Sequence, residues 1–135
     1  MANWYGSARS NYFRVKDANA FHEWTERRQL EVFKSDKEAD VVAIYPSENS
    51  DGAWPTYDLE EDAEFDLATE LAEHLVPGQV AVLLEVGAEK LRYLTGQAIA
   101  VNAEGGMVEL TLSDIYRTAA RAYRVPESEI TRAEY

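Results

Sequence analysis

Residues 79–112 read QVAVLLEVGAEKLRYLTGQAIAVNAEGGMVELTL and predict three consecutive β-strands. The run at 79–86 is almost continuously apolar, which is typical of a buried strand. The runs at 91–101 and 107–112 are separated by NAEGG, whose paired glycines favour a turn between antiparallel strands. This part of the chain therefore predicts an antiparallel sheet.

The chain before this stretch predicts a strand, a helix and a hairpin. Residues 11–16 alternate and are rich in aromatics, which indicates a strand. Asp17 is a suitable N-cap for a helix, because apolar residues recur after it near helical spacing at Phe21, Trp24 and Leu30. Two short β-type runs at 30–34 and 40–45 then predict a hairpin.

Two further helices are expected. The first covers about 64–76 and ends before Pro77 and Gly78, with its leucines on one side of the helical wheel and a stripe of carboxylates on the other. A loop rich in Ser, Asn, Gly and Pro precedes it at 46–57. Ser113 is the expected N-cap of the last helix, and Pro126 bounds that helix on the far side.

The predicted order of elements is β-α-β-β-α-β followed by β-β-α. The first six elements match the ferredoxin-like arrangement, so we expect a ferredoxin-like core with a C-terminal β-β-α extension. The 135 residues fit one domain, 1–135, and 46% hydrophobic residues supply a core. The predicted class is a single α+β domain with a mostly antiparallel sheet.

The negative charge of the chain is confined to its middle. The net charge is −12, yet residues 38–89 contain fourteen carboxylates and neither Lys nor Arg, while the rest of the chain is slightly basic. Ordinary solvated faces mix both signs, and general adaptation to salt would spread acids over the whole chain. The segment therefore favours a basic protein surface as its partner and disfavours direct contact with nucleic acid or anionic membranes.

The sequence offers little for catalysis or metal binding. The run DLEEDAEFD at 58–66 places oxygen ligands at alternate positions, but an EF-hand loop would need glycine at Ala63 and glutamate at Thr69. A weak divalent site there stays open. Glu70 and His74 could share a helix face, although no spacing supplies further ligands, and nucleophile and phosphate-loop motifs are absent. We expect no enzyme, no cofactor and no metal.

The candidate partner-binding surface combines an aromatic anchor with the densest acids. Trp54 lies in the loop just before the acidic run and could anchor an interface. The candidate residues are Trp54, Asp58, Glu60, Glu61, Asp62, Glu64, Asp66, Glu70 and Glu73. One stripe of acids is too sparse to imitate duplex DNA, so its neighbours must fill in beside it. Arg117, Arg121 and Arg124 share a face of the last helix, which we interpret as an ordinary solvated face.

The stretches NWYGSARSNYFRV at 3–15 and VLLEVGAEKLRYLTGQAIAV at 82–101, together with the chain length, resemble a group of small acidic proteins of bacterial plasmids and phages. Some proteins of such elements are antirestriction or anti-CRISPR inhibitors that imitate nucleic acid. The resemblance implies an inhibitor of a bacterial defence complex, and it assigns no residues. Two alternatives stay open: a self-associating module, such as a homodimer joined through Trp54 and the N-terminal aromatics, and a small enzyme with an acidic cleft. The lack of cysteine, of an apolar leader and of a membrane-spanning run favours the cytoplasm.

Overall fold

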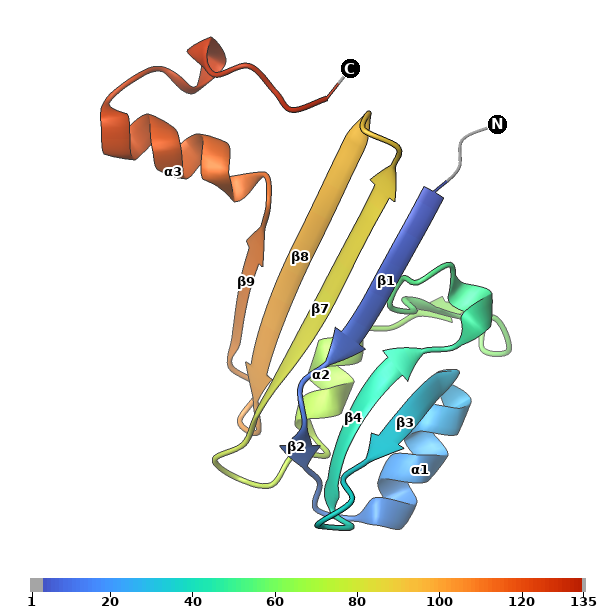
Figure 1. The fold of residues 1–135 in the computed structure, drawn as a ribbon. Helices are drawn as coiled ribbons and strands as arrows, with labels where there is room; N and C mark the ends of the chain where they lie inside the picture. Colours follow the sequence, from blue (N-terminus) through green and yellow to red (C-terminus); the bar gives the residue numbers. More distant parts are fainter. Residues whose placement is uncertain (1–3, 135) are drawn as a thin grey trace.

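The strands of the chain are divided between two main sheets, shown in the computed structural model of Figure 1, which describes residues 4–134 except the side chain of Asn49. The elements are β1 (Trp4–Ser10), β2 (Phe13–Arg14), α1 (Ala18–Arg27), β3 (Leu30–Lys34), β4 (Val41–Pro46), the 3₁₀ turn η1 (Glu48–Ser50), β5 (Tyr57–Asp58), β6 (Ala63–Glu64), α2 (Leu67–Ala72), β7 (Val80–Glu89), β8 (Tyr93–Asn102), β9 (Met107–Thr111), α3 (Asp114–Tyr123) and the 3₁₀ turn η2 (Glu127–Glu129). The large sheet has the order β1-β7-β8-β9, the smaller one β2-β4-β3, and β5 and β6 form a separate hairpin. All these pairs are antiparallel.

The predicted class is confirmed at its coarse level: the chain is a single small α+β domain with mostly antiparallel strands and three α-helices. The ferredoxin-like arrangement is not confirmed, because the strands that it needs in one sheet lie in two. The chain crosses between the sheets at Asn11, whose side chain donates to the carbonyl of Val80 (3.0 Å) and accepts from the amide of Val82 (2.8 Å). These side-chain bonds follow the last backbone pair between β1 and β7, and the chain then continues into β2, which pairs with β4. The sequence prediction also missed β1, the partner of β7.

The helix predicted at 64–76 is shorter than expected. Asp66 is its N-cap and accepts from the amides of Ala68 and Thr69, so residues 63–64 lie outside the helix in β6. At the other end, the amide of Val76 donates to the carbonyl of Arg14 (3.1 Å), which pulls the chain away from the helix axis and towards β2. Asp17 caps α1 as predicted, and the hairpin of β3 and β4 is confirmed.

The core lies between the two helices α1 and α2 and the inner faces of the sheets. Leu71, Leu75 and Ile44 are fully buried there, and Phe13 meets Phe21 edge to face at 6.0 Å. From the large sheet, the core takes Ala81, Leu83 and Val101. None of the helices in the described part of the chain is long and apolar enough to cross a membrane.

The end of the chain projects away from this core. We call residues 113–134 the C-terminal arm; it contains α3 and η2 and follows β9 (Figure 1). No residue of α3 is buried, and its packing is confined mainly to β9 and η2. The arm therefore contributes little to the core.

Candidate functional site

The densest acidic stretch forms the β5–β6 hairpin. Tyr57 pairs with Glu64 and Asp58 with Ala63. One carboxylate oxygen of Asp58 accepts from the amides of Glu60 (2.9 Å) and Glu61 (3.1 Å), which fixes the turn between the strands. The alternation of acids at 58–66 is thus explained by a hairpin with a side-chain-stabilised turn.

A single arginine, the C-cap residue of α1, joins two acids of the segment. The guanidinium of Arg28 donates to Asp58 at 2.7 Å and holds both oxygens of Glu70 at 2.8 Å. Its side chain is only 6% exposed and lies over the ring of Phe65 at 3.9 Å. The indole N–H of Trp24 also donates to Glu70 at 2.8 Å. We call Arg28, Asp58, Glu70 and Trp24 the buried ion cluster.

The cluster shifts the titration of its carboxyl groups. The hydrogen bonds from Arg28 hold the pKa of Glu70 below its usual value. The turn amides, first that of Glu61, together with the charge of Arg28, hold the pKa of Asp58 below its usual value. Both groups are therefore charged at neutral pH and engaged inside the protein.

Arg28 was missed because the charge analysis counted residues along the chain. A signal was present: Arg28 follows Phe21 by seven residues and Trp24 by four, so it lies on the apolar face of α1. A cation on a buried face requires an anionic partner. The acids of the segment are thus not all free of basic neighbours.

Trp54 and Asp66, two of the predicted contact residues, also have roles within the fold. Trp54 is 9% exposed; its backbone N–H donates to the Glu85 carboxylate (2.8 Å) and its indole N–H to the carbonyl of Leu84 (3.2 Å). The carboxylate of Asp66 is the N-cap of α2 described above, although the residue stays exposed. Trp54 is packed between α2 and the large sheet, so it offers a partner little surface.

The remaining predicted acids face solvent. Glu60, Glu61 and Glu64 are exposed and form no ion pair within residues 4–134, and Asp62 accepts only from the hydroxyl of Tyr57. Glu73 is exposed as well, but it caps the far end of α2, about 10 Å along the helix axis from Asp66.

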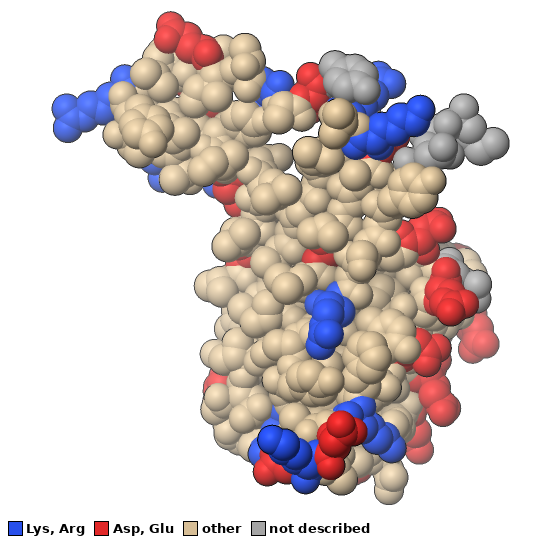
Figure 2. Space-filling view, in the orientation of Figure 1, with Lys and Arg blue, Asp and Glu red and all other residues tan. Residues whose placement is uncertain are grey.

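The loop that contains η1 adds two exposed acids, Glu48 and Asp51, beside the hairpin. Figure 1 places η1 and the hairpin at the same edge of the molecule, next to β1, and Figure 2 shows acidic side chains gathered along that edge. We call Glu48, Asp51, Glu60, Glu61, Asp62 and Glu64 the acidic edge.

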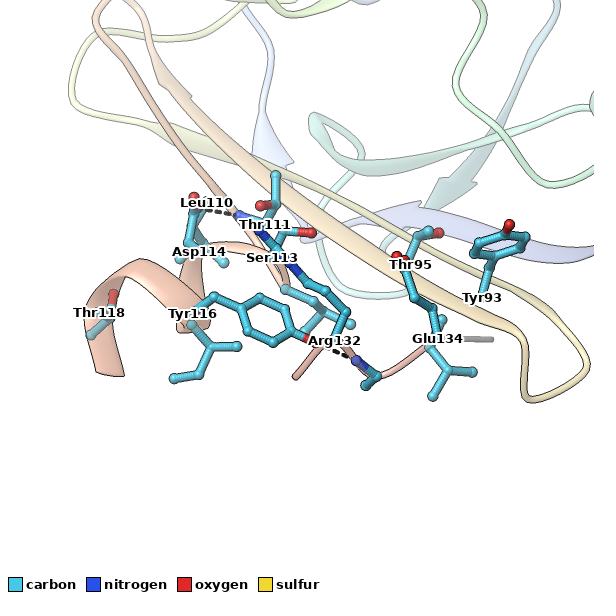
Figure 3. A pocket seen from close by; sticks show the side chains of 14 residues that line it. Tyr93, Thr95, Leu110, Thr111, Ser113, Asp114, Tyr116, Thr118, Arg132 and Glu134 are labelled. Atoms are coloured by element: carbon cyan, nitrogen blue, oxygen red, sulfur yellow. Dashed lines mark hydrogen bonds between the residues drawn. The ribbon is translucent and has the colours of Figure 1, made fainter. Parts of the chain in front are cut away.

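A cavity of about 680 Å³ lies at the other end of the molecule, between α3 and the strands β8 and β9 (Figure 3). Its polar groups bond within the arm and to the end of β9. The carboxylate of Asp114 accepts from the backbone amide of Thr111 (2.7 Å), and the hydroxyl of Tyr116 accepts from the backbone amide of Ala133 (2.7 Å). Arg132 lies over the ring of Tyr116 and pairs with Glu127 at 3.3 Å. No histidine lines the cavity, which offers a mostly aliphatic wall.

The two histidines are not arranged for chemistry. The ring of His74 lies 4.9 Å from that of Trp24 and 5.7 Å from that of Phe21, and burial lowers its pKa. The Glu70 carboxylate that could share its helix face is bound to Arg28 and Trp24 instead. In the chain from 4 to 134, no three His, Asp or Glu side chains are grouped to hold a metal ion.

Comparison of the chain with protein-family models, with curated proteins and with solved structures found no match. The site must therefore be interpreted from its own residues.

Proposed function

We propose that this chain is a non-enzymatic binding protein that presents its acidic edge to the basic, nucleic-acid-binding surface of another protein. One observation carries the proposal. Arg28, which lies beneath the β5–β6 hairpin, is already bound by Asp58 and Glu70, and within residues 4–134 the acids of the acidic edge form no ion pair. The charges of Asp58 and Glu70 are thus neutralised beneath the hairpin, whereas the acids of the acidic edge have no ion-paired cation within the described residues.

Folding does not account for this distribution. Exposed like charges repel one another and are mildly destabilising, and a mixed surface would be equally soluble. A concentrated negative edge does serve association, because it accelerates encounter with a positive partner and selects against negative ones. A protein that normally holds nucleic acid offers the largest such positive surface.

The class of partner that we propose is a bacterial restriction or CRISPR complex, with the chain acting in the cytoplasm as a nucleic-acid mimic encoded by a plasmid or phage. This narrower part rests on the resemblance of residues 3–15 and 82–101. Within the site, the acidic edge makes the contact, while Trp54, Asp58 and Glu70 hold the hairpin in position from beneath. Glu73 lies apart from the edge and contributes at most long-range attraction.

The test uses a triple charge reversal, Glu60→Lys, Glu61→Lys and Glu64→Lys. The matched control is Glu104→Lys, Glu109→Lys and Glu129→Lys, which changes the net charge equally at exposed positions outside the acidic edge. DNA binding by a panel of purified restriction and CRISPR complexes is measured by fluorescence anisotropy with each protein added. The wild type should displace DNA from at least one complex, and the triple reversal should weaken this by about tenfold or more, which is at least ~1.4 kcal/mol.

The control variant should remain within about twofold of the wild type, and displacement by the wild type should weaken as salt rises from about 0.05 to 0.3 M. Equal displacement by the wild type and the triple reversal, no dependence on salt, or no displacement from any complex would contradict the proposal.

A further inference from the structure

The outer face of the four-stranded sheet points away from α2 and the core. Strand register places side chains of directly paired residues on one face, so Arg9, Leu84, Ala98 and Leu110 form one row across β1, β7, β8 and β9. The other rows follow at every second residue. The residues on this side of the sheet together form what we call the outer face. They are Tyr5, Ser7, Arg9, Val80, Val82, Leu84, Val86, Ala88, Leu94, Gly96, Ala98, Ala100, Asn102, Val108 and Leu110.

This face is apolar and open to solvent. Val86 is 57% exposed, Leu110 60% and Val108 71%. It contains no carboxylate, and its only charged residue, Arg9, has its guanidinium over the rings of Tyr12 (5.8 Å) and Phe33 (5.6 Å). Figure 2 looks onto this side and shows a surface over β7 and β8 that is almost free of charge. The C-terminal arm borders one end of it, where Leu94 and Leu110 line the cavity beside α3.

The size of the outer face matches an interface. The strands β1, β7, β8 and β9 have 7, 10, 10 and 5 residues, 32 in all. At about 3.3 Å per residue and about 4.8 Å between strands, they give roughly 500 Å² of flat area, before the relief of the side chains is added. Monomeric proteins rarely expose larger apolar patches, and a standard interface buries about 800 Å² on each partner. The flat area is below this standard and the relief of the exposed side chains adds to it, so the face matches a small dimer interface.

The relief of the face is complementary to itself. β8 contributes the small residues Gly96, Ala98 and Ala100, while β7 and β9 on either side contribute valines and leucines. The result is a shallow channel between two aliphatic ridges, closed at one end by Leu112, whose Cγ lies 3.0 Å from where a Cβ on Gly96 would be. A second copy turned by a two-fold axis can place its β7 ridge in this channel, as in face-to-face sheet packing.

We propose that the outer face is the interface of a two-fold symmetric homodimer, in which the large sheets of two copies pack face to face. The chemistry of the face selects this occupant. An acidic or basic partner would find almost no countercharge here, whereas a second copy brings an equally apolar and almost uncharged surface of matching shape. The acidic edges stay outside the interface, so the dimer carries two of them. This inference does not depend on the proposed function.

The mass of the full chain is measured by sedimentation equilibrium between about 1 and 200 μM. The expected result is association towards twice the 15.2 kDa of one chain. Val86→Glu and Leu110→Glu should each weaken the dimer by about tenfold or more, because each buries a carboxylate in the apolar interface. Leu59→Glu is the matched control: Leu59 is an 83% exposed leucine in the hairpin turn, outside the outer face, and its variant should dimerise like the wild type.

Far-ultraviolet circular dichroism verifies that each variant is folded, and two substitutions on different strands keep the test decisive if one of them unfolds. Because both copies are negative and the interface is apolar, added salt should leave the dimer unchanged or strengthen it. The proposed partner contact has the opposite dependence on salt, so the two proposals can fail separately. A monomer at 200 μM, a dimer that survives both glutamate substitutions, or equal weakening by Leu59→Glu would overturn the inference.

Discussion

The core around Leu71 and the buried ion cluster differs in kind from the outer face and the C-terminal arm. In the core, Leu71 is fully buried and each charge has a partner of opposite sign. On the outer face, Val86, Val108 and Leu110 are more than half exposed, and α3 has no buried residue. The difference teaches that this chain buries one set of apolar residues in its core and leaves another set exposed on the outer face. The predictions below test that division.

The largest effect is expected from Arg28→Met. This substitution removes the cation and leaves Asp58 and Glu70 partly buried without countercharge, so the free energy of unfolding should fall by about 3–5 kcal/mol. Urea denaturation at neutral pH measures it. Arg27→Met on the same helix, at an exposed position, should change stability by no more than about 0.5 kcal/mol. A loss below about 1 kcal/mol for Arg28→Met would show that the cluster is not held as described.

Acid should weaken the same cluster in the wild type. The pKa values of Asp58 and Glu70 are lower in the folded than in the unfolded chain, so their stabilisation is present above their unfolded pKa values. It is lost as pH falls through their folded values. Arg28→Met should therefore lose less stability than the wild type on acidification, which urea titrations at a series of pH values would measure.

A leucine pair compares the two regions directly. Leu71→Ala opens a cavity in the packed core and should cost about 2–5 kcal/mol, whereas Leu110→Ala, at a 60% exposed position, should cost about 0.5 kcal/mol or less in the dilute monomer. Thermal unfolding at low protein concentration is the measurement. Equal losses would show that the outer face is covered in the monomer.

The sequence predicted the local elements well where one signal dominated. Asp17 with the apolar spacing of α1, the hairpin of β3 and β4, and the strands on either side of NAEGG all depend on neighbours within a few residues. The division into two sheets was not predictable, because it depends on the side chain of Asn11 bonding to β7, about seventy residues away. The β1 strand was missed because WYGSARS lacks the β-branched residues that mark strands.

The candidate site shows the same limit. Counting charges along the chain located the acidic segment, and its most acidic part does form a hairpin with an exposed edge. The count could not separate the exposed Glu60 from the buried Asp58, because that depends on Arg28, which lies thirty residues earlier. Trp54 is predicted to be an anchor because Trp is typical of interfaces and because this residue lies just before the acidic run. Its indole instead reaches the backbone of β7.

A smaller effect is expected at the N-termini of α2 and α3, where loss of the capping side chain should change the free energy of unfolding by different amounts. Asp66→Ala removes the carboxylate that caps α2 and should cost about 1 kcal/mol. Ser113→Ala at the start of α3 should have almost no effect, because the Ser113 side chain makes no capping bond. Urea unfolding of both variants measures the difference. A similar loss in both would contradict the view that the arm contributes little to the fold.

The smallest effect is expected from His74. The free energy of unfolding should decrease slightly as the pH falls from about 7.5 to about 5.5. Burial against Trp24 and Phe21 lowers the pKa of His74 in the folded chain, with Lys16 and Arg27 acting in the same direction and Glu73 and Glu70 against it. Below about pH 6.5 the unfolded chain binds a proton that the folded chain does not, so stability falls as pH decreases through this value. His74→Gln should remove this slope, and His22→Gln, which leaves His74 in place, should retain it. Asp58 and Glu70 do not interfere, because both titrate at lower pH. A slope that survives His74→Gln would place its origin outside the core and would weaken the contrast between the two regions.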